Sequence, residues 1–291
     1  TIQWFRENKE KINFSLNSLY KVINISKQAV NKFCKAQKMF TEKVEELVIE
    51  AQELRKEHPG CGVEKMYYVL RPDFIGRDRF IDIMMNLGFR VQYKKNYKRT
   101  TYSIANQYPN LIKGYLVNKP STIWQSDITY IALGERFYYA IFIIDVYTKL
   151  IVGHKISNHM RGTANLEALE IALKEYEAPA IHHSDRGSQY LYHEYINLLK
   201  SSGSSVSMAL SAQDNAYAER INRTIKEEYL DYWKPKTFEE LQKNINKAVW
   251  HYNENRIHEN LNKMTPREFY KNCFKKDFKN PIIEIYNNGS G

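Results

Sequence analysis

Three acidic residues stand in sequence settings that could support metal-dependent chemistry. Asp185 lies in the stretch HHSDRGSQY, residues 182–190, directly after an apolar run that is typical of a buried strand. Asp127 lies within the strand-like run WQSDITYIAL, and Glu219 lies one turn into the predicted helix NAYAERINRTIKEEY. Taken alone, Asp185 has an ordinary alternative interpretation, because Asp and Gly are also the residues of a strand-end turn.

Convergence of these carboxylates would favour one kind of chemistry. Three neighbouring carboxylates repel one another unless a cation lies between them. Oxygen ligands without a cluster of His or Cys suit Mg²⁺ or Mn²⁺. Two such ions roughly 3.5–4 Å apart activate an attacking oxygen and stabilise a leaving oxygen at one phosphodiester. Asp127, Asp185 and Glu219 would then be both catalytic residues and ligands of two Mg²⁺ or Mn²⁺ ions, in phosphoryl transfer on a polyanion.

The order of the predicted elements gives a reason for the three acids to converge. The pattern from residue 121 onward is β-β-β-α-β-α-β-α, which predicts an α/β sandwich with a mixed five-stranded sheet. In this arrangement the first and fourth strands are neighbours, and the last helix crosses them. Asp127 is in the first strand, Asp185 follows the fourth, and Glu219 is in that helix, so all three should meet at one edge of the sheet.

Other polar residues nearby have more ordinary interpretations. Asp145 ends a strand before a turn, which favours a turn-capping role. Asp214 and Asn215 precede the Glu219 helix and are predicted to cap it. His182 and His183 are interpreted as structural, with a place for His183 near the metals left open.

The charge is concentrated at the front of the chain. The protein has 291 residues and a formal net charge of +10, and residues 1–100 hold 20 basic against 12 acidic residues, a balance of +8. This front end contains two predicted pairs of helices, the first breaking near Asn24 with Ser26 as the next N-cap. Helix pairs with basic outer faces are typical of helix-turn-helix DNA binding, although any small helical hairpin has a similar pattern.

Candidate DNA contacts follow from this distribution, with a solvated basic surface as the alternative. Four groups are predicted, in the first helix pair, at the start of the last helix of the second pair, in a basic linker, and on the Glu219 face of its helix. They are Lys27, Gln28 and Lys32; Arg77 and Arg79; Lys94, Lys95, Lys98 and Arg99; and Asn222, Arg223 and Lys226.

These patterns divide the chain into six predicted parts. They are an N-terminal helix-turn-helix (1–40), a linker helix (41–58), a second helix-turn-helix (59–93), a basic linker (94–118), the α/β domain (119–232) and a C-terminal helical region (233–291). No run of about 18 apolar residues predicts a membrane span, and no signal peptide is expected. The three cysteines form no CxxC pair, which fits a reducing cytoplasm.

Several stretches of the sequence also resemble a known family. WQSDITYI, HHSDRGSQY and DNAYAERINRTIKEEYL resemble the three acidic motifs of DDE transposases and retroviral-type integrases, which share the ribonuclease-H-like fold. YNENRIHENLNKMTPREFY resembles the C-terminal motif of one bacterial insertion-sequence branch, and LYKVINISKQAVNKF with HPGCGVEKMYYVL resembles the opening of its second-frame product. The resemblance extends over roughly residues 15–272.

The resemblance assigns the metal-binding triad to Asp127, Asp185 and Glu219, with Asp127 bridging both ions. Here 33 residues separate Asp185 from Glu219, whereas the family has about 35, and loop residues between Ala209 and Asp214 are therefore not carried over. The resemblance implies a ribonuclease-H-like fold, location in the bacterial cytoplasm at the nucleoid, and movement through a circular intermediate. Implied partners are DNA, as terminal inverted repeats and target, a second copy or larger assembly on paired ends, and a first-frame helix-turn-helix product.

The function predicted from the sequence is that of an insertion-sequence DNA transposase. Metal-activated water would cut at the element end, and the freed 3′-OH would attack a second phosphodiester, without a covalent protein–DNA intermediate. Two alternatives remain at this point. One is a non-catalytic DNA-binding regulator or inactivated transposase, and the other is a ribonuclease-H-like nuclease that cuts without joining.

Overall fold

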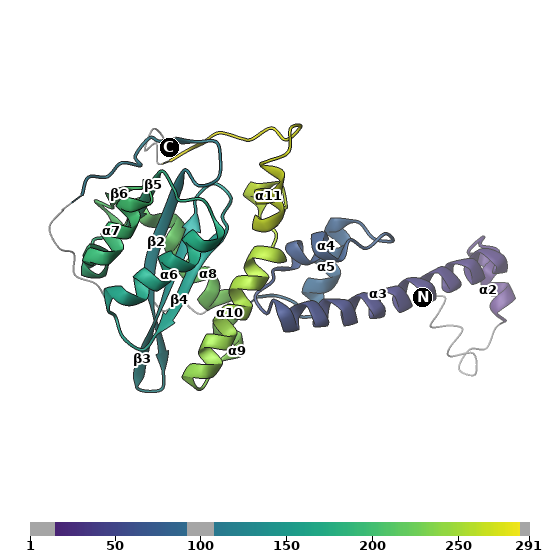
Figure 1. Ribbon diagram of the computed structural model, residues 1–291. Helices are drawn as coiled ribbons and strands as arrows, with labels where there is room; N and C mark the ends of the chain where they lie inside the picture. The colour runs from purple at the N-terminus through teal and green to yellow at the C-terminus, as the bar shows by residue number, and fades with distance from the viewer. Residues whose placement is uncertain (1–14, 92–107, 286–291) are drawn as a thin grey trace.

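A mixed sheet of five strands carries two of the three predicted carboxylates (Figure 1). The computed structural model describes residues 15–91 and 108–285. The strand order is β4-β3-β2-β5-β6, with β2, β3 and β4 antiparallel and with β5 and β6 parallel to β2. The predicted element order and the neighbouring position of the first and fourth strands are therefore confirmed. The strands are β2 (Ile123–Leu133), β3 (Arg136–Asp145), β4 (Ile151–Ser157), β5 (Ile181–Ser184) and β6 (Ser205–Met208).

Helices cover both faces of the sheet because successive side chains of a strand point to opposite faces. Trp124, Ile141 and Ile143 pack with α6 (Gly162–Glu175) and α7 (His193–Ser201). Ile131, Phe142 and Ile144, from the opposite face, pack with α8 (Ala216–Ile225) and α10 (Phe238–Glu254). The side chain of Trp124 is fully buried in the first of these clusters.

The C-terminal region packs into the same body and does not form a separate part. After α8 the chain passes through a π-helical turn, η4 (Lys226–Leu230), and α9 (Asp231–Trp233). Thr237 caps α10 and Thr265 caps α11 (Pro266–Asn272). Beyond these, β7 (Ile283–Glu284) pairs with β1 (Leu116–Val117). Because that ribbon buries Val117 with Phe269 and Ile285, residues 108–285 are called the sheet domain below.

In the N-terminal module, residues 15–91, one continuous helix, α3 (Lys27–Glu57), spans a stretch in which two separate helices were expected, one before and one after residue 40. The module consists of α2 (Leu16–Val22), α3, α4 (Val63–Leu70) and α5 (Arg77–Asn86). The predicted break at Asn24 and the Ser26 cap are confirmed. The boundary predicted between residues 40 and 41 is wrong, because no Gly or Pro interrupts α3 and Thr41 donates its hydroxyl to the Gln37 carbonyl within the helix.

The second half of α3 also belongs to the second helix pair and is not a free linker. Leu47 and Ala51 of α3 are buried together with Met66 and Phe80 from α4 and α5. Figure 1 shows α3 extending away from the sheet, with α2 at its far end and α4 and α5 beside the sheet domain. Among the described residues no helix is long and apolar enough to cross a membrane.

Candidate active site

Asp127, within β2, and Asp185, directly after β5, lie side by side where the pairing of these two strands ends. β2 and β5 run parallel, and their last aligned pair is Ser126 with Ser184. Each aspartate is the next residue in its chain, so the two carboxylates leave the sheet at the same level. The strand register thus brings together residues that are 58 positions apart in sequence.

The start of α8 is attached to β2 by side-chain hydrogen bonds at the two strand residues just before Asp127. Gln125 donates its Nε2 to the Asp214 carbonyl at 3.1 Å, and its Oε1 accepts the N–H of Tyr217 at 3.1 Å. Asn215 donates Nδ2 to the Ser126 carbonyl at 3.0 Å. Asn215 is the N-cap residue of α8, as predicted, but its side chain makes no capping bond and holds β2 instead. These bonds fix the helix that carries Glu219 against the strand that carries Asp127.

Asn222 completes this attachment at the carboxylate itself. It lies three residues after Glu219, on the same face of α8, and its Nδ2 donates to Asp127 Oδ2 at 2.7 Å. Only 7% of Asn222 is exposed. Its side-chain amide is thus buried against Asp127, and a DNA contact by Asn222 stays a prediction.

The loop after β5 is shaped around Asp185. The N–H of Gly187 donates to Asp185 Oδ1 at 2.9 Å, and a Cβ at Gly187 would lie 3.0 Å from the same oxygen. Arg186 donates Nε to the Ala209 carbonyl at 2.7 Å and a second N–H to the Leu210 carbonyl. Arg186 thereby holds the loop in which the chain is two residues shorter than the family pattern.

The electrostatics show that the three carboxylates act on one another. Burial raises the pKa of Asp127 well above its ordinary value, and repulsion from Asp185 and Glu219 adds to this rise. Burial also raises the pKa of Asp185, although the hydrogen bond from the Gly187 N–H lowers it. The pKa of Glu219 is raised by burial and by repulsion from Asp185. Ionisation of all three carboxylates together is therefore unfavourable unless a cation lies between them, although Arg223 opposes the rise of the pKa at Glu219.

The donor chemistry fits a hard divalent cation. All three side chains offer carboxylate oxygens, and the Asn222 Oδ1 is buried without a hydrogen-bond partner among the described residues. Within residues 15–91 and 108–285 no group of three His, Cys, Asp or Glu side chains is gathered closely enough to hold one metal ion. Glu219 is exposed, whereas Asp127 and Asp185 are half-buried.

The competing groups near the triad are accounted for by other bonds. Asp145 accepts the N–H and hydroxyl of Thr148 at 2.7 and 2.8 Å and the Ser121 N–H at 2.7 Å, which confirms its turn-capping role. His182 bonds the Tyr195 hydroxyl, and His183 Nδ1 bonds Ser207. Burial lowers the pKa of His182 to about 3 and that of His183 to about 4, so both rings are neutral at physiological pH.

The predicted DNA contacts occupy different kinds of position. Lys27, Gln28 and Lys32 are exposed on α3. Arg77 is exposed but bonds Asp78 at 2.9 Å and Glu64 at 3.3 Å, and Arg79 lies 4.4 Å from the Phe40 ring centroid. On the Glu219 helix Arg223 is exposed and Lys226 is half-buried, where attraction to Asp127 partly offsets the burial that lowers the pKa of Lys226. Four further contacts lie outside the described residues: Lys94, Lys95, Lys98 and Arg99.

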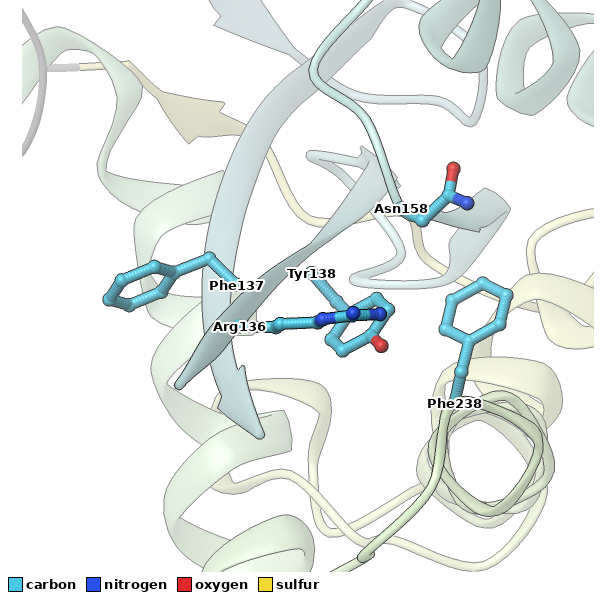
Figure 2. Close-up of a pocket in the computed structure, with 5 residues that line it drawn as sticks. All are labelled: Arg136, Phe137, Tyr138, Asn158 and Phe238. Carbon is cyan, nitrogen blue, oxygen red and sulfur yellow. The ribbon is translucent and has the colours of Figure 1, made fainter. Parts of the chain in front are cut away.

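A separate hollow lies at the tip of the β2–β3 hairpin. It encloses about 360 Å³ and is lined by Arg136, Phe137, Tyr138, Asn158 and Phe238. Figure 2 shows Phe137 pointing away from the other four residues. The rings of Tyr138 and Phe238 stack at 4.9 Å, which joins the hairpin to the start of α10. None of the three carboxylates lines this hollow.

The Asn222–Asp127 bond predicts a shift in the pH dependence of DNA cleavage. The bond lowers the pKa of Asp127, so Asn222→Ala should raise that pKa further. A metal ligand must be ionised, and the acidic limb of the cleavage rate should move to higher pH, with a loss of about tenfold to hundredfold below it. Rates measured from pH 5.5 to 9 test this, with the exposed Asn197→Ala as control. An unmoved limb would contradict the positioning role of Asn222.

Comparisons with known proteins agree with this arrangement. Models of the integrase core domain match residues 117–212 and 204–266. An uncharacterized 31 kDa protein of insertion element IS600 from Shigella sonnei is 34% identical over 203 residues, 67% of this chain and 75% of that protein. The transposase for insertion sequence element IS904 from Lactococcus lactis is 33% identical over 190 residues, 63% of this chain and 74% of that protein.

A solved structure supports the fold over most of the chain. The simian T-cell lymphotropic virus intasome, in complex with the PP2A regulatory subunit B56 gamma, aligns with a TM-score of 0.51 at 15% identity, over 82% of this chain and 79% of that one. At this identity the likeness concerns the fold alone, which is the ribonuclease-H-like arrangement described above. The integrase core models and the curated relatives show that the chain belongs to the insertion-sequence DDE transposases with an integrase core domain.

Proposed function

We propose that Asp127, Asp185 and Glu219 are the catalytic residues with which this transposase cuts DNA at the ends of its element and joins the freed 3′-OH to target DNA. One observation carries the proposal. Asp127 and Asp185 leave adjacent parallel strands at the same level, while the helix of Glu219 is bonded to β2 through Gln125, Asn215 and Asn222. This placement suits chemistry at a single phosphodiester.

The three carboxylates would hold Mg²⁺ or Mn²⁺, two ions per site, with Asp127 shared between them. When bound, such ions lower the pKa of a water molecule and stabilise charge on a leaving oxygen. Asn222 keeps Asp127 oriented, and the Gly187 N–H does the same for Asp185. Lys226, which is attracted to Asp127, would contact the phosphate of a bound DNA end.

Substrate recognition is assigned to the N-terminal module. Its exposed residues Lys27, Gln28 and Lys32 would contact the terminal repeat, and the basic residues at 94–99 would follow the DNA backbone. Arg77 and Arg79 stay predicted contacts that would have to exchange their present partners for phosphate. We also propose that a dimer or larger assembly acts on paired element ends, at the nucleoid, with a first-frame product as a further candidate partner.

Stability measurements should reveal the cation site independently of activity. The pKa of Asp127 is raised in the folded protein, so its ionisation opposes folding once the pH exceeds the ordinary value near 3.8. Asp127→Asn should therefore raise the melting temperature of the metal-free protein by roughly 2–5 °C at pH 8, and the gain should vanish as the pH falls toward about 4.

Added Mg²⁺ or Mn²⁺ should stabilise the wild type and leave Asp127→Asn unchanged. Differential scanning calorimetry with and without EDTA measures both effects. The exposed Asp277→Asn serves as a charge-matched control and should respond to the cation like the wild type. Equal stabilisation of Asp127→Asn and the wild type would show that the cation binds elsewhere.

The proposed function is tested with a labelled element-end oligonucleotide and supercoiled plasmid in the presence of Mg²⁺. The transposase should produce both a cut end and a product in which that end is joined to the plasmid. Cutting without joining would instead indicate a nuclease, and binding without either step would indicate a regulator. Either result would overturn the proposal.

A further inference from the structure

The N-terminal module touches the sheet domain at one very close backbone contact. The N–H of Gly60, in the loop between α3 and α4, donates to the carbonyl of Glu228 at 2.9 Å. A Cβ at position 60 would lie 2.4 Å from the Cα of Glu228, which is far inside contact distance. Glycine is therefore required here by the approach of another backbone. The partner residue lies within the π-helical turn η4, an element that is rare and is often found at functional positions.

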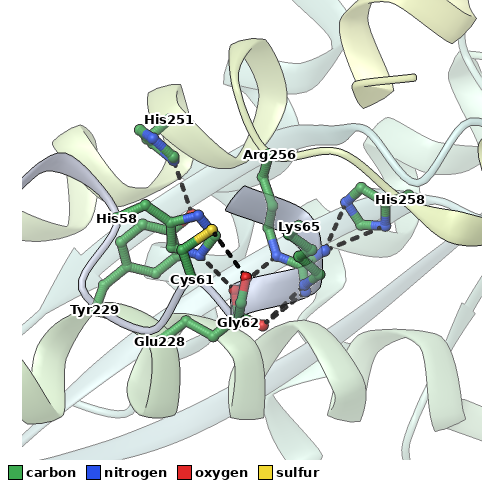
Figure 3. Close-up of polar contacts among 9 residues, drawn as sticks. All are labelled: His58, Cys61, Gly62, Lys65, Glu228, Tyr229, His251, Arg256 and His258. Carbon is green, nitrogen blue, oxygen red and sulfur yellow. Dashed lines mark hydrogen bonds and ion pairs between the residues drawn. The ribbon is translucent and has the colours of Figure 1, made fainter. Parts of the chain in front are cut away.

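The Glu228 carboxylate is held from both sides of this junction (Figure 3). Arg256, from the sheet domain, donates Nε and an Nη to its two oxygens at 2.8 and 2.6 Å. The Nε2 of His58, which directly follows α3, lies 2.6 Å from Oε2, the oxygen that also accepts the Arg256 Nε–H. Lys65 of α4 approaches to 3.6 Å. Since only 12% of the Glu228 side chain is exposed, the cluster is largely shielded from solvent.

Protonation states in the cluster follow from its geometry. Burial would raise the pKa of Glu228, but the hydrogen bonds from Arg256 and His58 outweigh it and hold that pKa far below the ordinary range. Burial lowers the pKa of His58, so the ring is neutral and its Nε2–H must be the donor to the ionised carboxylate. The module therefore contributes a specific hydrogen-bond donor to a charge pair that the sheet domain already contains.

Further contacts fix the orientation of the module as well as its position. The His58 ring stacks on Tyr229 with centroids 5.1 Å apart and lies 4.9 Å from His251. At another point of the junction the Lys263 ammonium lies 3.4 Å from the centroid of the Tyr68 ring on α4. Contacts at separated points resist rotation, whereas a single contact would act as a pivot.

The junction is built on the same helical run that carries the third carboxylate. Glu228 follows Glu219 by nine residues, and a helical rise of 1.5 Å per residue places them roughly 13 Å apart along the run. Any movement of the module at Gly60 is therefore a movement relative to Glu219 and Asn222. The docking surface and the candidate active site therefore lie on one continuous helical run.

We propose that His58, Gly60 and Glu228 are positioning residues that hold the N-terminal module at a fixed distance and orientation from the carboxylates, so that the DNA end is cut at one defined phosphodiester. The inference rests on the proposed function of the triad and of the module. It assigns to Glu228 a task in setting the cutting position, separate from metal binding and from DNA contact.

The test uses the full chain with two variants on the module side. Gly60→Val inserts a side chain into the backbone contact, and His58→Ala removes the donor without creating a clash, which covers the case in which the first variant fails to fold. Glu57→Gln is the control, because the Glu57–Lys247 ion pair crosses the same junction with both side chains about half exposed. Hydrogen exchange of residues 58–66 and 225–235 reports docking, and cleavage of a labelled end is mapped to the nucleotide.

Both variants should exchange faster at the two sides of the junction while strands β2 and β3 keep their protection. End binding and Mg²⁺-dependent nicking of plasmid DNA should stay within about threefold of the wild type, because neither the module surface nor the triad changes. Cleavage at the wild-type phosphodiester should fall about tenfold to hundredfold, with new cuts at neighbouring positions. The control should behave as the wild type.

Two results would overturn the inference. One is faster exchange at the junction together with cleavage at the wild-type position and rate, because docking would then have no part in positioning. The other is unchanged exchange in both variants, which would show that these residues do not hold the module. A wild type that neither cuts nor nicks would contradict the proposed function instead, and exchange alone would then decide whether the junction is held as described.

Discussion

Asp127→Asn is expected to abolish cutting and joining while leaving the binding of element-end DNA almost intact. Repulsion from both Asp185 and Glu219 raises the pKa of Asp127. The hydrogen bond from Asn222 fixes the orientation of the Asp127 carboxylate. Losing a shared metal ligand should lower the cleavage rate at least about thousandfold, which corresponds to roughly 4 kcal/mol of transition-state stabilisation. Cleavage is measured in Mg²⁺, and binding is measured in Ca²⁺.

Glu219→Gln should give the same result from the helix side, and the exposed Asp277→Asn should cut like the wild type. Binding within about threefold of the wild type in all three variants would show that the carboxylates act on the reaction and not on DNA affinity. Cleavage by Asp127→Asn at a rate near that of the wild type would remove this residue from the site.

The second large effect concerns the origin of DNA affinity. A fragment of residues 1–105 should bind the element end specifically, because residues 1–100 carry a balance of +8 and the second half of α3 shares a buried core with α4 and α5. The fragment 106–291 should bind the same DNA roughly a hundredfold more weakly and with a shallower salt dependence. Fluorescence anisotropy at two or more salt concentrations measures both properties.

Equal binding by the two fragments would place recognition in the sheet domain. The helix pair at α2 and α3 would then not be the DNA-reading element. Lys27→Ala and Lys32→Ala within the first fragment provide a finer comparison, and each should reduce the salt slope by about one unit.

The sheet and the place of the carboxylates could be predicted because local patterns determine them. β2 and β3 alternate in side-chain direction, so Trp124 and Ile131 had to face different layers, and the element order made β2 and β5 neighbours. Once those strands are parallel, the positions of Asp127 and Asp185 follow from the pairing of Ser126 with Ser184.

Features that depend on distant contacts could not be predicted. Its place on the Glu219 face of the helix suggested that Asn222 contacts DNA. Its hydrogen bond to Asp127 depends on how closely α8 packs on β2, which the local sequence does not determine. The pairing of β1 with β7 joins two-residue segments more than 160 positions apart. Gly60 offered one weak signal, as a glycine after His58-Pro59, which the sequence presents as an ordinary helix end.

The continuity of α3 was missed for a different reason. Threonine often caps the start of a helix, but inside a continuous helix its hydroxyl can donate to the carbonyl four residues earlier, as Thr41 does to Gln37. Trp250 of α10 is 58% exposed, because α10 turns its other face to the sheet.

The most direct test of the central claim is the strand-transfer reaction with a 3′-labelled pre-cut end, analysed on a denaturing gel with and without protease treatment. The proposed mechanism predicts that the wild type, in Mg²⁺, joins the end to plasmid DNA, that the product is unchanged by protease, and that Glu219→Gln forms none of it. A joined product formed at the wild-type rate by Glu219→Gln, or a labelled species that protease converts to free DNA, would contradict phosphoryl transfer by Asp127, Asp185 and Glu219.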